Sequence, residues 1–239
     1  NLVYPRPSAD FDHKAATLFD ENVLSVMDEV YHKTGERIDL VIFLNGLAIF
    51  TIELKCESSG TGWDYRDAIK QYKFERDCKS PLLMPKVGAL THFAMDTHEV
   101  WTCAELKGAD SKFLPFNKGV REDGASHETQ AGNSVVPNGI ATSYMWEYIL
   151  TKDVVFPLIY DFVYYTRDRK TNKKKDEKPI FPRFGTRKPW NPWGPAARPR
   201  LGYLPTALST PVGSCVTYRW WRPPPNSMAV FAAAAISRP

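Results

Sequence analysis

The sequence predicts a mixed α/β domain with a central β-sheet flanked by helices, followed by an irregular C-terminal tail rich in proline, arginine and tryptophan. The α/β prediction follows from the order of the segments: strand-type runs, an amphipathic helix, further strands and closing helices. The tail is predicted from an abrupt change of composition. With 239 residues, of which 43% are hydrophobic, the chain can bury the core of one ordinary domain plus an appendage.

We divide the chain into four parts, namely a partly ordered entry segment (1–20), the α/β domain (21–166), a charged linker (167–178) and the tail (179–239). There is no initiator methionine and no leader-like start, so we expect the natural N-terminus to lie upstream. No run of eighteen apolar residues occurs, so we expect a soluble, cytoplasmic protein without a membrane segment. The four cysteines are scattered without a C-x-x-C pair, which predicts free thiols.

The first half of the domain reads as a series of strands. Apolar residues in Val23–Tyr31 fit either a short strand or a helical turn, and Lys33–Glu36 is typical of a turn. Ile38–Leu44 is apolar on both faces except for one aspartate, which predicts a central, buried strand. Asn45-Gly46 is a strong hairpin signal, so we expect Leu47–Lys55 to be the returning strand.

A helix is predicted after this hairpin. Asp64 is a suitable N-cap for a helix that runs to about Asp77, and Ala68, Ile69 and Tyr72 form its apolar stripe. We interpret these three side chains as core residues.

The rest of the domain contains a second strand pair and two helices. Gly88–Met95 and His98–Ala104 are predicted strands, and Tyr144–Leu150 and Val154–Tyr165 are predicted helices.

The tail differs from the domain in charge as well as in composition. Nine of the 31 basic residues and none of the 27 acidic residues follow Glu177, so residues 1–177 have 22 bases against 27 acids and a net charge of −5. Residues 179–239 also hold twelve of the nineteen prolines, which disfavours helices and central strands. One interpretation is a disordered basic arm for nucleic acid. The interpretation that we prefer is a segment translated in a shifted reading frame.

Three charged residues interrupt the predicted hairpin: Asp39 in one strand, and Glu53 and Lys55 on one face of the other. A two-residue Asn-Gly loop would pair Asp39 with Ile52 and place Glu53 on the opposite face, which rules out a shared site. A three-residue loop with a bulge would place Asp39 and Glu53 diagonally on one face, with Cβ atoms roughly 7–8 Å apart. The site hypothesis therefore requires the three-residue loop.

Two carboxylates on one face can bind one Mg²⁺ ion, because Mg²⁺ prefers oxygen ligands and keeps several waters. Such an ion supports phosphodiester hydrolysis, with Lys55 orienting water or neutralising phosphate. On spacing alone, the better interpretation is that these are strand-end charges facing water. The cost of burying unpaired charges in otherwise apolar strands favours a metal site.

The sequence also resembles a known family. The run from Arg37 to Lys55 looks like the nuclease motif of type I restriction enzyme R subunits, which belong to the PD-(D/E)xK nuclease superfamily. Further blocks that recur in this family, in the same order, are Asp67–Tyr72 with Arg76-Asp77, His92–Asp96, Phe113–Gly119, Ala131–Asn133, Tyr144–Glu147 and Ile180–Arg183. The resemblance covers about residues 20–184.

The resemblance implies a restriction-endonuclease-like core that cleaves DNA with Mg²⁺. It implies that Asp39 and Glu53 are Mg²⁺ ligands and that Lys55 is the catalytic lysine. Gln71 matches the glutamine of the family's Q-x-x-x-Y helix motif, although Glu75 stands where the motif has tyrosine. The family's acidic residue from an N-terminal helix has no match.

The resemblance further implies double-stranded DNA, a methyltransferase subunit and a specificity subunit as partners. The family's ATP-driven motor begins with a G-x-x-x-x-G-K-[ST] loop, which does not occur in these residues, so we expect no ATP site. Two alternatives stay open. One is an inactive remnant or docking fragment of such a subunit, and the other is a non-specific nucleic-acid-binding protein that acts through the tail.

Overall fold

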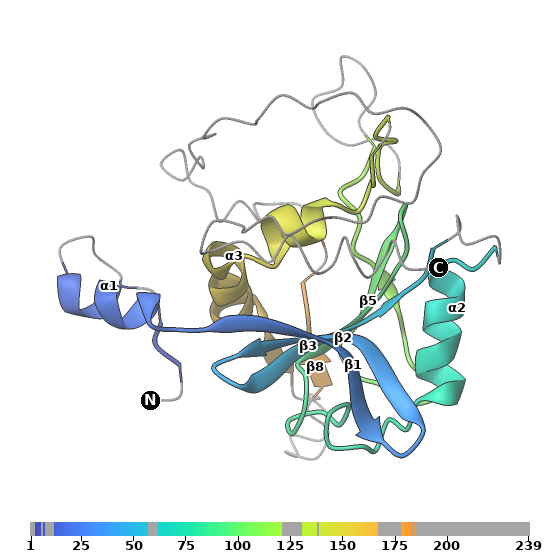
Figure 1. The fold of residues 1–239 in the computed structure, drawn as a ribbon, viewed down its shortest axis with the longest axis horizontal. Helices are drawn as coiled ribbons and strands as arrows, with labels where there is room; N and C mark the ends of the chain where they lie inside the picture. Colours follow the sequence, from blue (N-terminus) through green and yellow to red (C-terminus); the bar gives the residue numbers. More distant parts are fainter. Residues whose placement is uncertain are drawn as a thin grey trace.

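The structure, a computed structural model, describes residues 3–5, 7, 12–56, 62–120, 131–137, 139–166, 178–182 and 184. Its main feature is a six-stranded sheet in the order β1-β2-β3-β4-β5-β6 (Figure 1). The strands of this sheet are β1 (Leu24–Lys33), β2 (Glu36–Leu44), β3 (Leu47–Leu54), β4 (Thr91–Met95), β5 (Val100–Cys103) and β6 (Leu114–Pro115). The helices are α1 (His13–Asp20), α2 (Tyr65–Lys70), α3 (Lys152–Pro157) and the π-helices η2 (Gln71–Glu75), η3 (Met145–Ile149) and η4 (Leu158–Phe162). A separate two-stranded sheet consists of β7 (Tyr164–Thr166) and β8 (Lys178–Ile180).

The strand directions make the large sheet mixed. Strands β3 and β4 are parallel, whereas the other neighbouring pairs are antiparallel. Parallel neighbours need a crossover connection, and α2 with η2 lies within it, between β3 and β4 in the chain. The predicted mixed α/β architecture is therefore confirmed.

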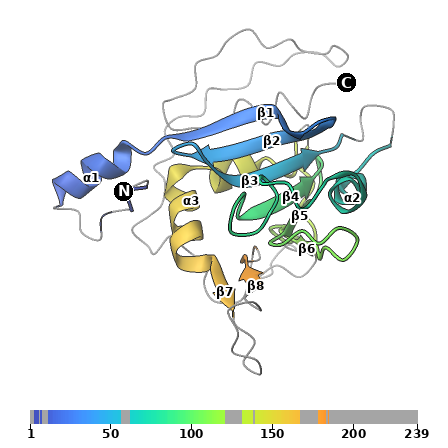
Figure 2. The same cartoon turned by 90° about the horizontal axis from the view of Figure 1, so that it is seen from below.

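The sheet separates two hydrophobic clusters. One cluster contains Leu40 and Ile52 from the sheet and Phe156 from α3. The other contains Val41 from the sheet and Tyr72 from η2. Helices α2 and α3 therefore lie on opposite sides of the central strands (Figure 2), and α1 extends from the end of the molecule remote from α2 (Figure 1).

The loop between β2 and β3 is the two-residue alternative, so the three-residue loop that the site hypothesis required is not formed. Leu44 pairs with Leu47, and the two residues between them, Asn45 and Gly46, have φ angles of 49° and 82°. Positive φ at both positions is what a type I′ turn requires, and its twist matches that of the flanking strands. Asn-Gly meets this requirement without an additional loop residue.

A β-bulge after this turn restores the face relation that a regular two-residue hairpin would have excluded. Phe43 pairs with Ala48, but the next residue, Ile42, pairs with Phe50, so Ile49 is the extra residue. The register shifts by one from this point, and Leu40 pairs with Ile52. Continuing this register by one step sets Asp39 directly opposite Glu53.

Most of the other predicted elements are present, with shifted ends. The open choice at Val23–Tyr31 is resolved as strand β1, and the predicted helix at Tyr144–Leu150 is η3. The predicted helix Val154–Tyr165 is present as α3 and η4, but its last residues belong to strand β7. The entry segment contains α1, capped by the Asp12 side chain, which accepts a hydrogen bond from the Ala15 N–H.

The predicted start of the irregular tail at residue 179 is too early. Strand β8 pairs with β7, and Phe181 is buried in the cluster shared with α3. This segment is retained in the fold because its aromatic side chain stacks edge-on against Phe50 and Phe93. Residues 185–239 lie outside the described residues, so the interpretations of the tail stay predictions.

Two composition-based expectations also bear on the described residues. Among the described residues, Cys56, Cys78 and Cys103 form no disulfide with one another. Within the described ranges, no helix combines the length and apolar character needed to cross a membrane.

Candidate functional site

Asp39 and Glu53 meet on the face of the sheet that α2 and η2 cover. Asp39 Oδ2 accepts a hydrogen bond of 2.8 Å from the Leu54 N–H on the neighbouring strand, which fixes the aspartate against β3. The Glu53 side chain is fully buried, with a relative exposure of 0%. Residues directly opposite one another in a sheet typically have Cβ atoms about 4.5–5.5 Å apart, whereas the diagonal arrangement expected from the sequence would set them roughly 7–8 Å apart.

A third charged residue, Arg76, pairs with Glu53. Arg76 Nε donates to Glu53 Oε1 at 2.7 Å, and the two side chains are 10% and 0% exposed. The sequence placed Arg76 in a family block, but no role was predicted for it. A search for a basic residue near the end of the helix that covers Glu53 would have identified it.

Burial raises the pKa of the Glu53 carboxyl to about 8, and the negative charge of Asp39 acts in the same direction. The hydrogen bond and the charge of Arg76 lower this pKa but do not offset the two larger effects. At neutral pH the metal-free site therefore holds a proton on Glu53, which a divalent cation would displace.

Two polar atoms of the predicted site are buried without a hydrogen-bond partner: Glu53 Oε2 and Gln71 Oε1. Such atoms are few in a folded protein, and each requires an explanation, because an unsatisfied buried polar group costs about 1–3 kcal/mol. Both atoms are oxygens that can coordinate a hard cation.

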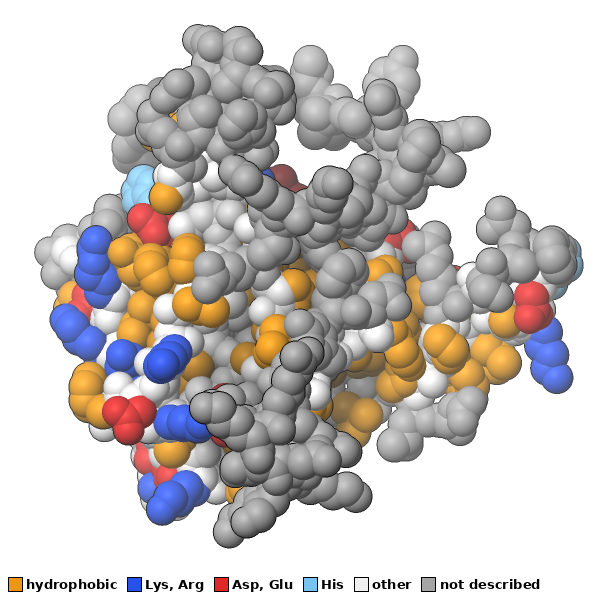
Figure 3. All heavy atoms as spheres, turned by 180° about the vertical axis from the view of Figure 1, so that it is seen from behind, with side chains coloured by type: hydrophobic (Ala, Val, Ile, Leu, Met, Phe, Trp, Pro, Cys, Tyr) orange, Lys and Arg blue, Asp and Glu red, His pale blue; other side chains and the backbone are white. Residues whose placement is uncertain are grey.

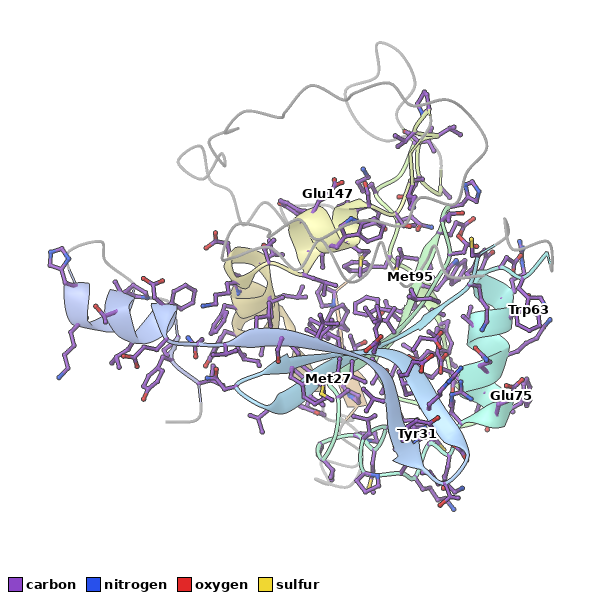
Figure 4. The ribbon with its side chains drawn as sticks, in the orientation of Figure 1. Met27, Tyr31, Trp63, Glu75, Met95 and Glu147 are labelled. Carbon is purple, nitrogen blue, oxygen red and sulfur yellow. The ribbon has the colours of Figure 1, made fainter. Side chains whose placement is uncertain are left out.

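Helix η2 is fixed to the sheet by a buried hydrogen-bonded network. The Tyr72 hydroxyl lies 2.9 Å from Thr51 Oγ1, which lies 2.7 Å from His92 Nδ1. Tyr72 and Ala68 are fully buried and Ile69 packs against the same cluster, which confirms their predicted core role. Glu75 is exposed at the far end of η2 (Figure 4), so it does not replace the family's tyrosine in the interior.

Lys55 follows the last residue of β3, and its ammonium lies over the ring of Trp63, 5.3 Å from the centroid. Its side chain is half-buried, and Trp63 is exposed beside α2 (Figure 4). Among the described residues, no ion pair joins Lys55 to Asp39 or Glu53. The structure thus brings Asp39 and Glu53 together directly, with Lys55 at the edge of the group.

Helix α2 is fixed in place by its cap. Asp64 and Asp67 form a capping box at its start, and the hydrogen bond from Lys70 is the largest of several effects, including the charge of Lys55, that lower the pKa of Asp67. Lys and Arg side chains gather on the side of the molecule where α2 lies (Figure 3). Arg66 and Lys70 of α2 form ion pairs with Asp64 and Asp67.

The donor set suits a hard cation. Within the described ranges, no cluster of three or more His, Cys, Asp or Glu side chains is arranged to hold a metal, so the set differs from a structural zinc site. The carboxylate oxygens of Asp39 and Glu53 are the kind of ligand that Mg²⁺ prefers, and Mg²⁺ fills its remaining coordination positions with waters. The buried oxygens without partners therefore fit Mg²⁺.

One known family matches the part of the chain that carries these residues. Residues 10–111 match the family described as the type I restriction enzyme R protein N terminus. This part of the chain is therefore similar to the N-terminal segment of such R proteins. The matched segment contains Asp39, Glu53, Lys55, Gln71 and Arg76. No curated protein and no solved structure matches the chain.

Proposed function

We propose that this chain carries a Mg²⁺-dependent DNA endonuclease domain of a type I restriction R subunit, with a PD-(D/E)xK core. The proposal depends chiefly on one observation: Glu53, opposite Asp39, is fully buried and one of its carboxylate oxygens has no hydrogen-bond partner.

The energetics favour a cation at this position. Two facing carboxylates repel each other when both are ionised, so Glu53 keeps its proton in the absence of a cation. Ionising it in the interior costs several kcal/mol unless a nearby charge compensates it. Arg76 compensates one oxygen of Glu53, but the second has no partner. If this position served packing alone, two apolar side chains would stabilise the fold at least as well as two buried carboxyl groups. The presence of Asp39 and Glu53 here therefore supports a bound ion.

Each residue then has a distinct role. Asp39 and Glu53 would hold the metal through carboxylate oxygens, and Gln71 Oε1 supplies a further buried oxygen on the helix side. Bound Mg²⁺ would supply Lewis acidity and an activated water for phosphodiester hydrolysis. Lys55 is half-buried at the edge of the group, where its ammonium would orient that water or neutralise the phosphate.

We propose double-stranded DNA as the substrate, with the methyltransferase and specificity subunits of a type I complex as partners. This proposal extends the family assignment of residues 10–111. The proposal concerns DNA cleavage alone.

The test is Mg²⁺-dependent nicking of supercoiled plasmid by the full chain assembled with its partner subunits. We expect Glu53→Gln to abolish nicking together with Mg²⁺ binding. Lys55→Met should reduce nicking by roughly 100-fold or more, the scale on which one stabilising group contributes, while Mg²⁺ still binds.

Matched controls are available on the exposed surface. Glu75→Gln and Lys112→Met remove the same charges from exposed positions and should leave nicking unchanged. Full nicking by both Glu53→Gln and Lys55→Met would reject the nuclease assignment. If the unaltered chain assembles with its partner subunits but shows no Mg²⁺ binding that depends on Asp39 and Glu53, the inactive remnant or docking fragment is supported instead.

A further inference from the structure

The backbone around Arg76 is fixed from both sides. Its N–H donates to the Gln71 carbonyl oxygen at 3.0 Å, the i→i+5 bond that closes the π-helix. The next N–H, that of Asp77, donates to Glu36 Oε2 at 2.7 Å. Lys33 in turn pairs with Asp77 at 3.1 Å and with Glu36 at 3.3 Å.

The π-helical turn determines where the Arg76 side chain goes. A π-turn inserts one extra residue relative to an α-helix, and such turns are frequent at functional sites. In an α-helix, the N–H that bonds to the Gln71 carbonyl oxygen would be that of residue 75, whereas in this π-helix it is that of Arg76. Here Glu75 is exposed, and Arg76 reaches Glu53 instead.

The contact between Arg76 and Glu53 is one-sided. Arg76 Nε binds Oε1, whereas Oε2 has no partner. A guanidinium can bind a carboxylate through two parallel bonds, and that arrangement would occupy both oxygens. The observed geometry orients the carboxylate and leaves one oxygen available.

We propose that Arg76 is a positioning residue of this site: it holds Glu53 through Oε1 so that Oε2 is presented to the divalent cation. This inference rests on the proposed function. Without Arg76, Glu53 would lose its compensating charge in the interior, and it would turn away or remain neutral. Either outcome weakens metal binding.

The test is calorimetric titration of the full chain with MgCl₂, together with urea unfolding in EDTA. We expect Arg76→Gln to weaken Mg²⁺ binding by about tenfold or more, the equivalent of about 1.4 kcal/mol. Arg76→Lys keeps the charge without the fixed Nε geometry, so it should recover part of the affinity. A higher Mg²⁺ affinity in Arg76→Lys than in Arg76→Gln would show that the charge beside Glu53 matters, and not merely the volume of the side chain. Urea unfolding in EDTA shows whether each variant is folded.

The outcomes distinguish this inference from the proposed function. If the unaltered chain shows no Mg²⁺ binding that Glu53→Gln removes, the proposed function fails, and the inference fails with it. If the unaltered chain binds Mg²⁺ but Arg76→Gln binds equally well, only the positioning role is overturned. Tighter binding by Arg76→Gln would overturn it too, because Arg76 would then compete with the cation.

Discussion

Asp39 lies directly opposite Glu53 because one extra residue, Ile49, shifts the register between their strands. The two-residue turn alone would have paired Asp39 with Ile52, whose side chain belongs to the other hydrophobic cluster. Because side chains alternate along a strand, a shift of one residue exchanges the faces. The bulge therefore decides whether the two carboxyl groups share a site.

Mg²⁺ should stabilise the folded protein. At free Mg²⁺ of 100 times the dissociation constant, linkage gives about 2.7 kcal/mol, which for a domain of this size corresponds to a rise in Tm of about 5–10 °C. Thermal unfolding in MgCl₂ and in EDTA measures this shift. Glu53→Gln should lose the shift and Glu75→Gln should keep it; an equal shift in both variants would contradict the assigned ligand.

The stability of the metal-free protein should fall as the pH rises toward 8. The folded-state pKa of Glu53 is raised to about 8, chiefly by burial, whereas the unfolded value is about 4.3. Between these two pKa values the folded state therefore holds a proton that the unfolded state releases. The stabilisation from this proton is fully present below the unfolded pKa. As the pH rises to the folded pKa, the free energy of unfolding falls by at most about 1.4 kcal/mol per pH unit. Urea unfolding in EDTA between pH 6 and 8.5 should show the decline, and Glu53→Gln should flatten it.

Gln71→Leu should separate metal binding from stability. The substitution removes a buried amide oxygen that has no partner, so unfolding in EDTA should show unchanged stability or a gain of about 1 kcal/mol. Mg²⁺ affinity measured by calorimetry should fall, because an oxygen donor is lost. A large loss of stability with unchanged affinity would show that Gln71 is a structural residue.

Tyr72→Phe should have the opposite pattern. It removes the hydroxyl that bonds to Thr51 and leaves that buried hydroxyl with His92 alone. We expect a loss of about 1–2 kcal/mol in urea unfolding, with Mg²⁺ affinity changed by no more than about twofold. Loss of affinity without loss of stability would indicate that Tyr72 contributes to the site itself.

Gly46→Ala should destabilise the hairpin through backbone strain alone. A Cβ at this position meets no atom within 4 Å, but its φ of +82° disfavours a side chain. The expected loss is roughly 1–2 kcal/mol by urea unfolding, and Gly46→Asn should lose less, because asparagine tolerates this conformation. Equal losses in the two variants would point to a cause other than the backbone.

The sequence allowed the kinds of element to be predicted, because those depend on local patterns. The apolar run at Ile38–Leu44, the Asn-Gly turn and the Asp64 cap each gave a correct strand, turn or helix. The ends were less accurate: β8 and Phe181 join the fold through contacts with residues far away in the chain, which no local pattern reports.

For the site, the sequence by itself determined which charges interrupt the apolar strands and which family the segment resembles. Tertiary structure alone decided that Asp39 faces Glu53 and that Arg76 reaches Glu53. The reason is physical: a bulge and a π-turn each add one residue where packing of distant side chains favours it, and both effects depend on burial in the folded chain.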